Sequence, residues 1–170
     1  NNSEDISRLE GFLFPDTYEF YVNEKGSSAI KRLIDNFDRK LNDDLLEQAE
    51  ARGYNLKEIV TIASLIEKET DGKDHGKIAS VINNRLNTNG ETVGKLQIDA
   101  TLAYINGGKA PTEADKQIDS PYNTYLYKGL PAGPISNPGM ESIQAAMHPE
   151  KTNYFYYALG DDGVHHFNTN

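Results

Sequence analysis

The sequence predicts an α+β fold, in which several helices surround a central acid-bearing helix and a small antiparallel sheet includes a C-terminal hairpin. Three observations support this class. Apolar residues recur at helical spacing in the first half of the chain, a stretch rich in Gly, Pro and Asn follows, and two strand-like segments flank a Gly-Asp-Asp-Gly turn at residues 160–163. A length of 170 residues suffices for one core, so we expect one domain over residues 1–170.

Composition narrows the classes of partner. The formal net charge of −9 argues against a nucleic-acid partner and against docking on anionic lipid. No apolar run approaches the roughly 18–20 residues that a membrane span needs. Cysteine is absent, which excludes disulfides and thiolate nucleophiles. The adjacent pair His165–His166 would point apart in a strand, and no histidine pair has the i, i+4 spacing of zinc helices, so we expect neither a metal nor a cofactor.

The first elements follow from glycine, proline and apolar spacing. Residues 1–26 are expected to be extended and rich in aromatic side chains, because glycine and proline interrupt regular structure there. The next apolar stripe predicts a helix that is capped by Ser27 or Ser28 and stops at Gly53. The residues of this stripe are Ile30, Leu33, Ile34, Phe37, Leu41, Leu45 and Leu46.

A second helix over about residues 56–70 ends with two carboxylates. Glu69 falls inside its apolar arc, between Leu65 and Ile62, whereas Glu67 lies towards the other side of the arc. A carboxyl group against aliphatic neighbours resists ionisation, and an acid that is still protonated near neutral pH can donate a proton in catalysis. The alternative is a pair of surface glutamates at a frayed helix end, and periodicity favours Glu69 only slightly.

The second half of the chain is expected to be less regular, because turn-forming residues are frequent in it. A long loop inside a compact domain is usually functional. We expect the remaining elements as a helix at 76–86, a short mixed segment at 96–105, a long shaped loop at 106–138, a helix at 141–147, and hairpin strands at 154–159 and 164–167.

Several polar residues outside the second helix are candidates for contact with a polar polymer. Gln97 and Asp99 alternate in a short segment, which would turn both side chains to one face. The other candidates carry an aromatic ring, amides, a hydroxyl, a titratable donor and a carboxylate. Such groups can form hydrogen bonds or packing contacts with the hydroxyl and N-acetyl groups of a sugar. Structural roles stay open for these residues: a helix cap, an Asx turn, a routine turn, or core packing. The further candidates are Asp16, Tyr122, Asn123, Thr124, His165 and Asn168.

Eight tracts resemble, in order, motifs of the MltG-like (YceG-like) endolytic murein transglycosylases. They lie at residues 10–18, 63–70, 81–86, 96–99, 122–125, 129–135, 148–149 and 165–170. The resemblance implies that residues 1–170 are a YceG-like catalytic domain. We expect this domain to be a fragment of a longer protein, because the family's membrane helix and LysM-like region are absent from the sequence.

The family's catalytic acid is the Glu that precedes Thr, which corresponds to Glu69, and Glu67 matches an adjacent family glutamate with a supporting role. The implied reaction cleaves the β-1,4 bond between N-acetylmuramic acid and N-acetylglucosamine within a peptidoglycan strand and leaves a 1,6-anhydro end. The resemblance also implies an extracytoplasmic protein that is tethered to the cytoplasmic membrane by the absent anchor and works beside peptidoglycan synthases.

Two alternatives from other functional classes remain at this point. The first is a muramidase-type glycoside hydrolase, with Glu69 as the acid and Asp99 as the second carboxylate. The second is a glycan-binding module in which the chemistry has been lost.

Overall fold

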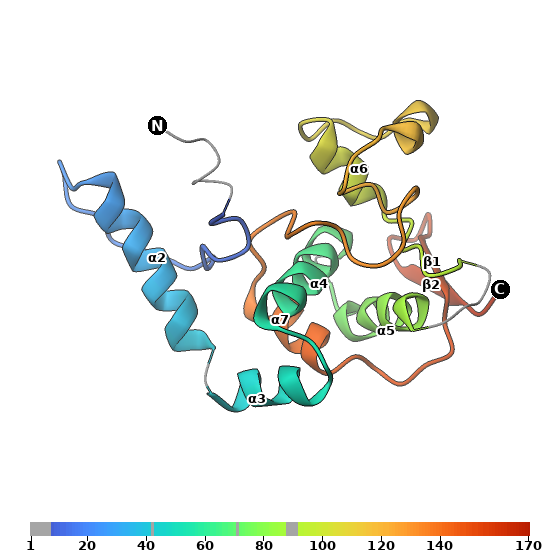
Figure 1. The fold of residues 1–170 in the computed structure, drawn as a ribbon, viewed down its shortest axis with the longest axis horizontal. Helices are drawn as coiled ribbons and strands as arrows, with labels where there is room; N and C mark the ends of the chain where they lie inside the picture. The colour runs from blue at the N-terminus through green and yellow to red at the C-terminus, as the bar shows by residue number, and fades with distance from the viewer. Residues whose placement is uncertain (1–7, 42, 71, 88–91) are drawn as a thin grey trace.

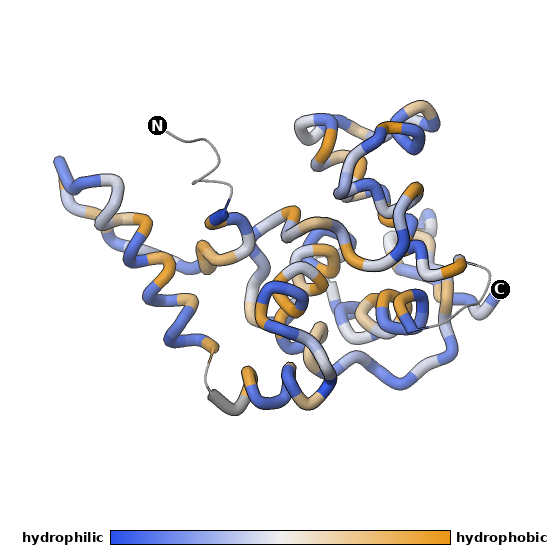
Figure 2. The backbone as a smooth tube through the Cα atoms, in the orientation of Figure 1, coloured by the Kyte–Doolittle hydropathy of each residue, from blue (hydrophilic) through white to orange (hydrophobic). Residues whose placement is uncertain are grey.

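The fold is built around one buried helix. The computed structural model describes residues 8–41, 43–70, 72–87 and 92–170. The helix α4 (Leu56–Glu69) lies at the centre of the molecule (Figure 1) and contacts four other helices: α3 (Asp43–Ala51), α5 (His75–Leu86), α6 (Asp99–Ile105) and α7 (Met140–Met147). Hydrophobic residues concentrate along these central helices (Figure 2).

Local chemistry explains where α4 begins. The Asn55 side chain accepts a hydrogen bond from the Glu58 amide, and the Glu58 side chain accepts one from the Asn55 amide, so two amides that lack helical partners are satisfied. Every residue from Ile59 to Ile66 is buried. The polar members of this run find local partners: Thr61 donates to the Lys57 carbonyl, and Ser64 donates to the Thr61 carbonyl.

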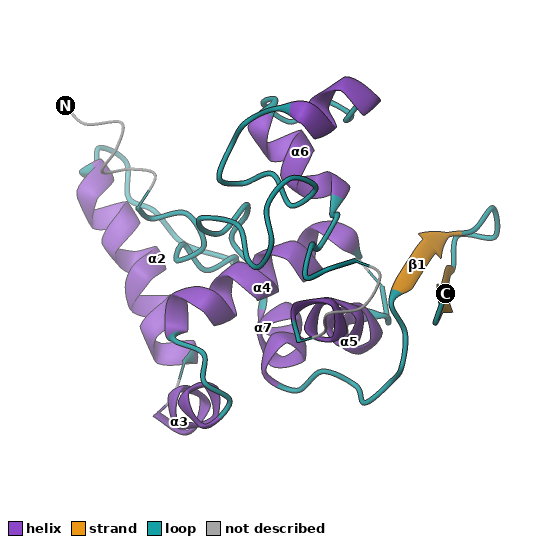
Figure 3. Cartoon of the chain, turned by 45° about the vertical axis from the view of Figure 1, so that its right-hand side comes forward, coloured by secondary structure: helices purple, strands orange, loops and turns teal. Residues whose placement is uncertain are grey.

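The predicted α+β class is confirmed, with a two-stranded antiparallel sheet formed by β1 (Tyr156–Leu159) and β2 (His165–Asn168). Tyr157 pairs with Phe167 and Leu159 with His165. The hairpin stands beside α5 at one side of the molecule, and α2 lies at the other (Figures 1 and 3). The short 3-10 helix η1 (Glu113–Gln117) is the regular element within the predicted long loop.

The prediction of one helix between Ser27 and Gly53 is wrong. The structure has two helices there: α2 (Gly26–Lys40), which begins after Lys25 without a side-chain cap, and α3. Leu41 adopts an extended conformation and ends α2. The helix α3 lies against α4 and α7. Phe37 of α2 instead packs against Phe12, with a ring-centroid distance of 5.3 Å.

The irregular N-terminal segment is held to the core at Gly11. The Asn137 side-chain oxygen accepts hydrogen bonds from the Gly11 amide at 2.8 Å and the Leu13 amide at 3.0 Å. Gly11 has a φ of +89° and lies against Pro134 and Val60. Among the described helices, none is both long and apolar enough to cross a membrane.

Replacing Gly11 by alanine tests this close approach. The added Cβ would lie 2.6 Å from Pro134 Cγ and 2.7 Å from Val60 Cγ1, in a left-handed backbone conformation. We expect Gly11→Ala to lower the free energy of unfolding by about 2–4 kcal/mol, from backbone strain and overpacking together. Urea denaturation measures this change.

The matched control is Gly107→Ala, where φ is +75° and nothing lies within 4 Å of the added Cβ. This control should lose only the backbone part, about 1–2 kcal/mol. Equal losses in the two variants would contradict the argument from close contact.

Candidate active site

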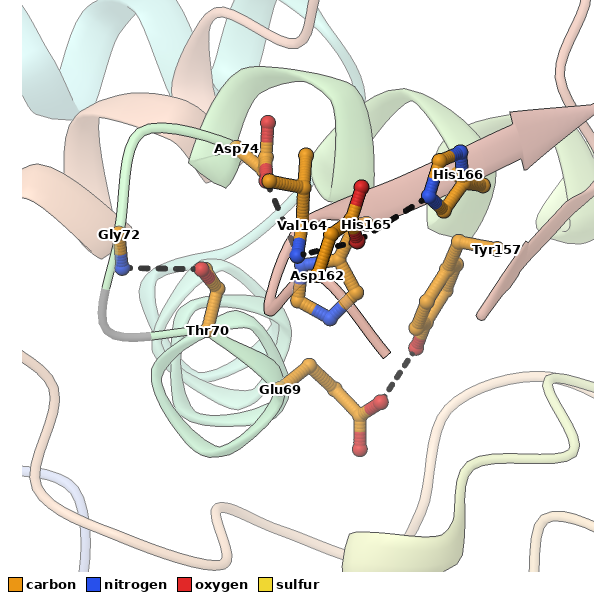
Figure 4. A network of polar contacts seen from close by, with 9 residues as sticks. All are labelled: Glu69, Thr70, Gly72, Asp74, Tyr157, Asp162, Val164, His165 and His166. Atoms are coloured by element: carbon orange, nitrogen blue, oxygen red, sulfur yellow. Dashed lines mark hydrogen bonds and ion pairs between the residues drawn. The ribbon is translucent and has the colours of Figure 1, made fainter. Parts of the chain in front are cut away.

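The centre of the candidate site is Glu69, the last residue of α4. Its side chain is half-buried and extends from the helix end towards the hairpin (Figure 4). There its Oε2 accepts a hydrogen bond of 2.7 Å from the Tyr157 hydroxyl. The next residue, Thr70, is already extended, and its hydroxyl accepts a hydrogen bond from the Gly72 amide at 3.0 Å. The Glu69 carboxyl group is therefore the last side-chain group of α4.

Burial raises the pKa of Glu69 above its ordinary value. Two hydrogen-bond donors, the Tyr157 hydroxyl and the Ala100 amide, act against this rise in pKa because they favour the charged form. The charge of Asp99 raises the pKa of Glu69 further, and His165 lowers it. The balance leaves a carboxylic acid that keeps its proton to a higher pH than an exposed glutamate does. This is the property that the sequence predicted for it.

The hairpin supplies an aromatic and polar wall beside this acid. The Tyr157 ring meets the His165 ring edge-on at 5.9 Å and the Phe167 ring at 6.2 Å. His165 is itself held by Asp74, with 3.3 Å between Nδ1 and the Asp74 Oδ2 (Figure 4). His165 therefore lies beside Glu69, and its Nδ1 contacts Asp74.

A buried arginine connects the segments around Glu69. Arg85 of α5 is 7% exposed. Its Nε donates to the Phe155 carbonyl at 2.7 Å, and its Nη1 donates to the Leu96 carbonyl. Its guanidinium also lies over the Tyr156 ring, 5.4 Å from the centroid. The segments that lead to Tyr157 and to α6 are thus tied to the same side chain.

The structure brings Asp99 to the site. Leu96 and Ile98 are buried while Gln97 and Asp99 are exposed, as the alternation predicts. The backbone is not a strand, however, because Gln97 has a left-handed φ of 53° and Asp99 already begins α6. Asp99 accepts a hydrogen bond of 2.5 Å from the Tyr125 hydroxyl. Its charge raises the pKa of Glu69, so it lies near the acid.

Two other candidates are buried and form hydrogen bonds within the protein. Asn123 is buried, its amide nitrogen donates to the Ile118 carbonyl at 2.8 Å, and its oxygen accepts from the Tyr125 amide at 2.9 Å. The Thr124 hydroxyl is also buried and accepts from the Ile98 amide at 3.0 Å. These contacts shape the loop and leave both side chains turned away from solvent.

Tyr122 lies far from Glu69. Its ring lies 5.0 Å from the Tyr104 ring at a tilt of 41°, and it lines a pocket with Lys57. Lys57 is at the other end of α4, twelve residues from Glu69, which corresponds to roughly 18 Å along a helix. The expectation that Tyr122 joins the same sugar-binding set is therefore not supported by its position.

The remaining candidates divide between the hairpin and distant places. Asn168 is exposed at the end of β2, where its side-chain oxygen accepts from the Thr169 amide at 2.7 Å. Asp16 accepts a hydrogen bond of 3.1 Å from Asn36 of α2, at the side of the molecule opposite the hairpin (Figures 1 and 3). Asp16 is thus outside the group around Glu69.

The Glu67 side chain connects α4 to the start of α7. Its Oε2 accepts from the Gly139 amide at 3.0 Å and from the Ser142 hydroxyl at 2.6 Å. These donors lie at the start of α7, where backbone amides lack partners within the helix, so Glu67 provides a hydrogen-bond acceptor for a neighbouring helix. No group of three or more His, Asp or Glu side chains within the described parts of the chain is arranged to hold a metal ion.

Three residues of this site were missed from the sequence: Tyr157, Arg85 and Tyr125. Arg85 carried a signal, because it follows Ile78 and Ile82 on the buried face of α5, where a charged side chain calls for an explanation. Tyr157 belongs to an aromatic run of the hairpin, in which nothing local distinguishes the ring that reaches the acid.

The chain is similar to proteins of one known family. The model of the YceG-like family matches residues 1–170. A Bacillus subtilis protein named endolytic murein transglycosylase is 38% identical over 158 residues, which cover 91% of this chain and 43% of that protein. A Streptococcus pneumoniae protein of the same name is 34% identical over 161 residues, which cover 88% of this chain and 28% of that protein.

Among solved structures, the crystal structure of a YceG-like protein from Listeria monocytogenes is similar, with a TM-score of 0.86 and 35% identity. The match covers 95% of this chain and 53% of that one. The chain therefore spans about half the length, or less, of the proteins that it matches.

The raised pKa of Glu69 predicts a pH-dependent effect on stability. A carboxyl group whose pKa is higher in the folded than in the unfolded state stabilises the fold while protonated, and this contribution is lost as the pH rises through the folded pKa. We expect Glu69→Gln to unfold at a higher temperature than wild type at about pH 8 and close to it at about pH 4. Thermal unfolding followed by circular dichroism measures this, with the exposed Glu47→Gln of α3 as the control. The same difference at both pH values would contradict the prediction.

Glu67 gives a second stability prediction. Glu67→Ala removes the acceptor of two donors at the start of α7, one of them on the buried Ser142, and should cost about 1–3 kcal/mol of unfolding free energy. Glu67→Gln retains an acceptor oxygen and should cost less. Urea denaturation of both variants measures the two costs, and a Gln variant as unstable as the Ala variant would refute the acceptor role.

Proposed function

The chain belongs to the YceG-like family, and from this premise we propose that it is an endolytic peptidoglycan lytic transglycosylase. It cleaves the β-1,4 bond between N-acetylmuramic acid and N-acetylglucosamine within glycan strands and leaves 1,6-anhydro ends. The observation that carries the proposal is Glu69, a half-buried acid with a raised pKa at the end of α4. The names of the related proteins from two organisms support the same reaction.

In the proposed mechanism one acid acts twice. Protonated Glu69 donates its proton to the glycosidic oxygen as the bond from that oxygen to C1 breaks. The C6 hydroxyl of the same muramic acid residue then attacks C1, and the Glu69 carboxylate takes the hydroxyl proton. The acid is regenerated and no water is consumed. An intramolecular nucleophile has a high effective concentration, so the reaction needs no activated water.

The surroundings of Glu69 suit both halves of this cycle. Burial keeps the acid protonated for the first step, and the donors Tyr157 and Ala100 stabilise the carboxylate that forms. Asp99, Gln97, His165 and Asn168 are the residues that we propose for contact with the sugars. Asp99 and His165 lie close enough to Glu69 to change its pKa. Gln97 and Asn168 are exposed on the adjoining segments.

A muramidase that uses Asp99 as a second carboxylate is the main alternative. Asp99 lies near Glu69, which favours this alternative, but it also accepts a short hydrogen bond from Tyr125. A hydrolase adds one water to each cleaved bond, and a transglycosylase adds none. A glycan-binding module without activity is the other alternative, and it requires that the acid has no catalytic use.

The proposed place of action follows from the substrate. Peptidoglycan lies outside the cytoplasmic membrane, so we propose an extracytoplasmic protein whose macromolecular partner is the glycan strand. A membrane tether elsewhere in the protein and neighbouring peptidoglycan synthases belong to the same proposal, and both rest on the resemblance to the family.

Product analysis of wild type and Glu69→Gln on uncrosslinked glycan strands tests the function. We expect the wild type to release fragments with anhydro ends and Glu69→Gln to lose about 100- to 10,000-fold in rate, because the general acid is gone. Mass spectrometry identifies the ends, and Glu47→Gln is the matched control. Ends heavier by one water would indicate the muramidase. Near-normal turnover by Glu69→Gln would show that another group is the acid.

A further inference from the structure

We propose that Tyr157 is a positioning residue, which holds Oε2 of the Glu69 carboxyl group so that Oε1 faces the sugar and carries the transferred proton. This inference rests on the proposed function, in which Glu69 is the acid. It adds a residue from the hairpin, 88 positions further along the chain, and it distinguishes the two oxygens of the acid.

The contact itself is specific. The Tyr157 hydroxyl donates to Oε2 at 2.7 Å (Figure 4). A glutamate side chain has three rotatable bonds, and one strong hydrogen bond to one oxygen restricts all of them. The Ala100 amide is a second donor to the same carboxyl group. Because Oε2 accepts the tyrosine hydrogen, we assign the proton of the acid to Oε1.

Tyr157 can fix the acid only if its own ring is fixed. The ring packs edge-on against His165 at 5.9 Å and lies 6.2 Å from the Phe167 ring, and Tyr157 pairs with Phe167 across the hairpin. His165 is held in turn by Asp74, which directly precedes α5, at 3.3 Å. These contacts therefore fix the position and orientation of the Tyr157 hydroxyl relative to the end of α4.

Arg85 fixes the hairpin relative to α4. Its Nε holds the Phe155 carbonyl at 2.7 Å, two residues before Tyr157. The helix α5, which carries Arg85, packs against α4, which carries Glu69. A chain of direct contacts therefore leads from α4 through α5 to the base of the hairpin. Loss of this connection would move the tyrosine, and with it the acid.

The hydroxyl is suited to donate and not to exchange protons. Burial raises the pKa of Tyr157 well above its ordinary value, and the nearby Glu69 charge raises it further. Tyr157 therefore keeps its proton at pH values at which an exposed tyrosine begins to lose it. Its hydrogen bond favours the carboxylate and lowers the pKa of Glu69, against the effect of burial. The tyrosine thus stabilises the carboxylate that forms when Glu69 gives up its proton in the first half of the cycle.

Tyr157→Phe removes the hydroxyl and keeps the ring. The expected result is a higher pKa of Glu69, a shift of the pH optimum to higher values, and a fall in kcat of about 10- to 100-fold, which corresponds to the loss of a hydrogen bond to a charged group. The control is Tyr154→Phe, because the Tyr154 ring packs on Phe167 at 5.5 Å in the same aromatic group. Thermal unfolding verifies that both variants are folded.

Two measurements separate the possible failures. The pKa of Glu69 is measured by carbon NMR of its carboxyl group in the substrate-free protein, with Glu69→Gln used to assign the signal. The rate and its pH profile are measured on uncrosslinked glycan strands. A purely structural tyrosine would leave the pH profile in place and change only stability.

The inference is supported if Tyr157→Phe raises the pKa of Glu69 and moves the pH profile in the same direction, while Tyr154→Phe changes neither. It is overturned if wild type cleaves the strands and Tyr157→Phe matches it in rate and pH profile, in which case the proposed function stands. If wild type leaves the strands intact, the proposed function fails, and the role of Oε1 in proton transfer fails with it.

Discussion

The complete burial of α4 from Ile59 to Ile66 is the constraint on which the rest of this structure depends. An ordinary surface helix buries one stripe, and a helix that is buried all round needs neighbours on every side. Helices α3, α5, α6 and α7 provide them, and the Ile135 amide donates to Ser64 where the loop before α7 crosses. The helix end then leaves the core beside the hairpin, and for this reason a carboxyl group at its last residue is only half-exposed.

The two glutamates at this end show how position decides the role of a side chain. Glu67 faces α7 and accepts hydrogen bonds from its first residues, which fixes one helix to another. Glu69, two residues later, faces the hairpin, where burial raises its pKa more than the nearby Tyr157 hydroxyl and His165 lower it. Residues that are two apart on a helix point in different directions. The same amino acid therefore serves the fold at one position and the proposed chemistry at the next.

The sequence predicted the parts of this architecture that depend on local patterns. The helices near 56–70, 76–86 and 141–147 and the C-terminal hairpin follow from periodicity and turn residues, and all of them are present. The break after Lys40 was missed because the apolar stripe continues through it. The site was harder to predict, since its members come from α4, α5, α6, the hairpin and the loop that carries Tyr125. Asn123 had the right chemistry for a sugar, but its partners are carbonyl groups of its own loop, which no local pattern reveals.

The hairpin has a consequence for how the protein would respond to heat. A two-stranded hairpin is marginally stable alone, and this one is attached through side chains such as Arg85 and His165 while the tip residues Leu159 and Val164 are exposed. Proteins open locally where few apolar contacts hold a segment. Tyr157 and Phe167 pack against the core, but no residue of β1 or β2 is fully buried, so we expect the hairpin to open on warming before the helical core does. Function would then have a lower thermal limit than the fold itself.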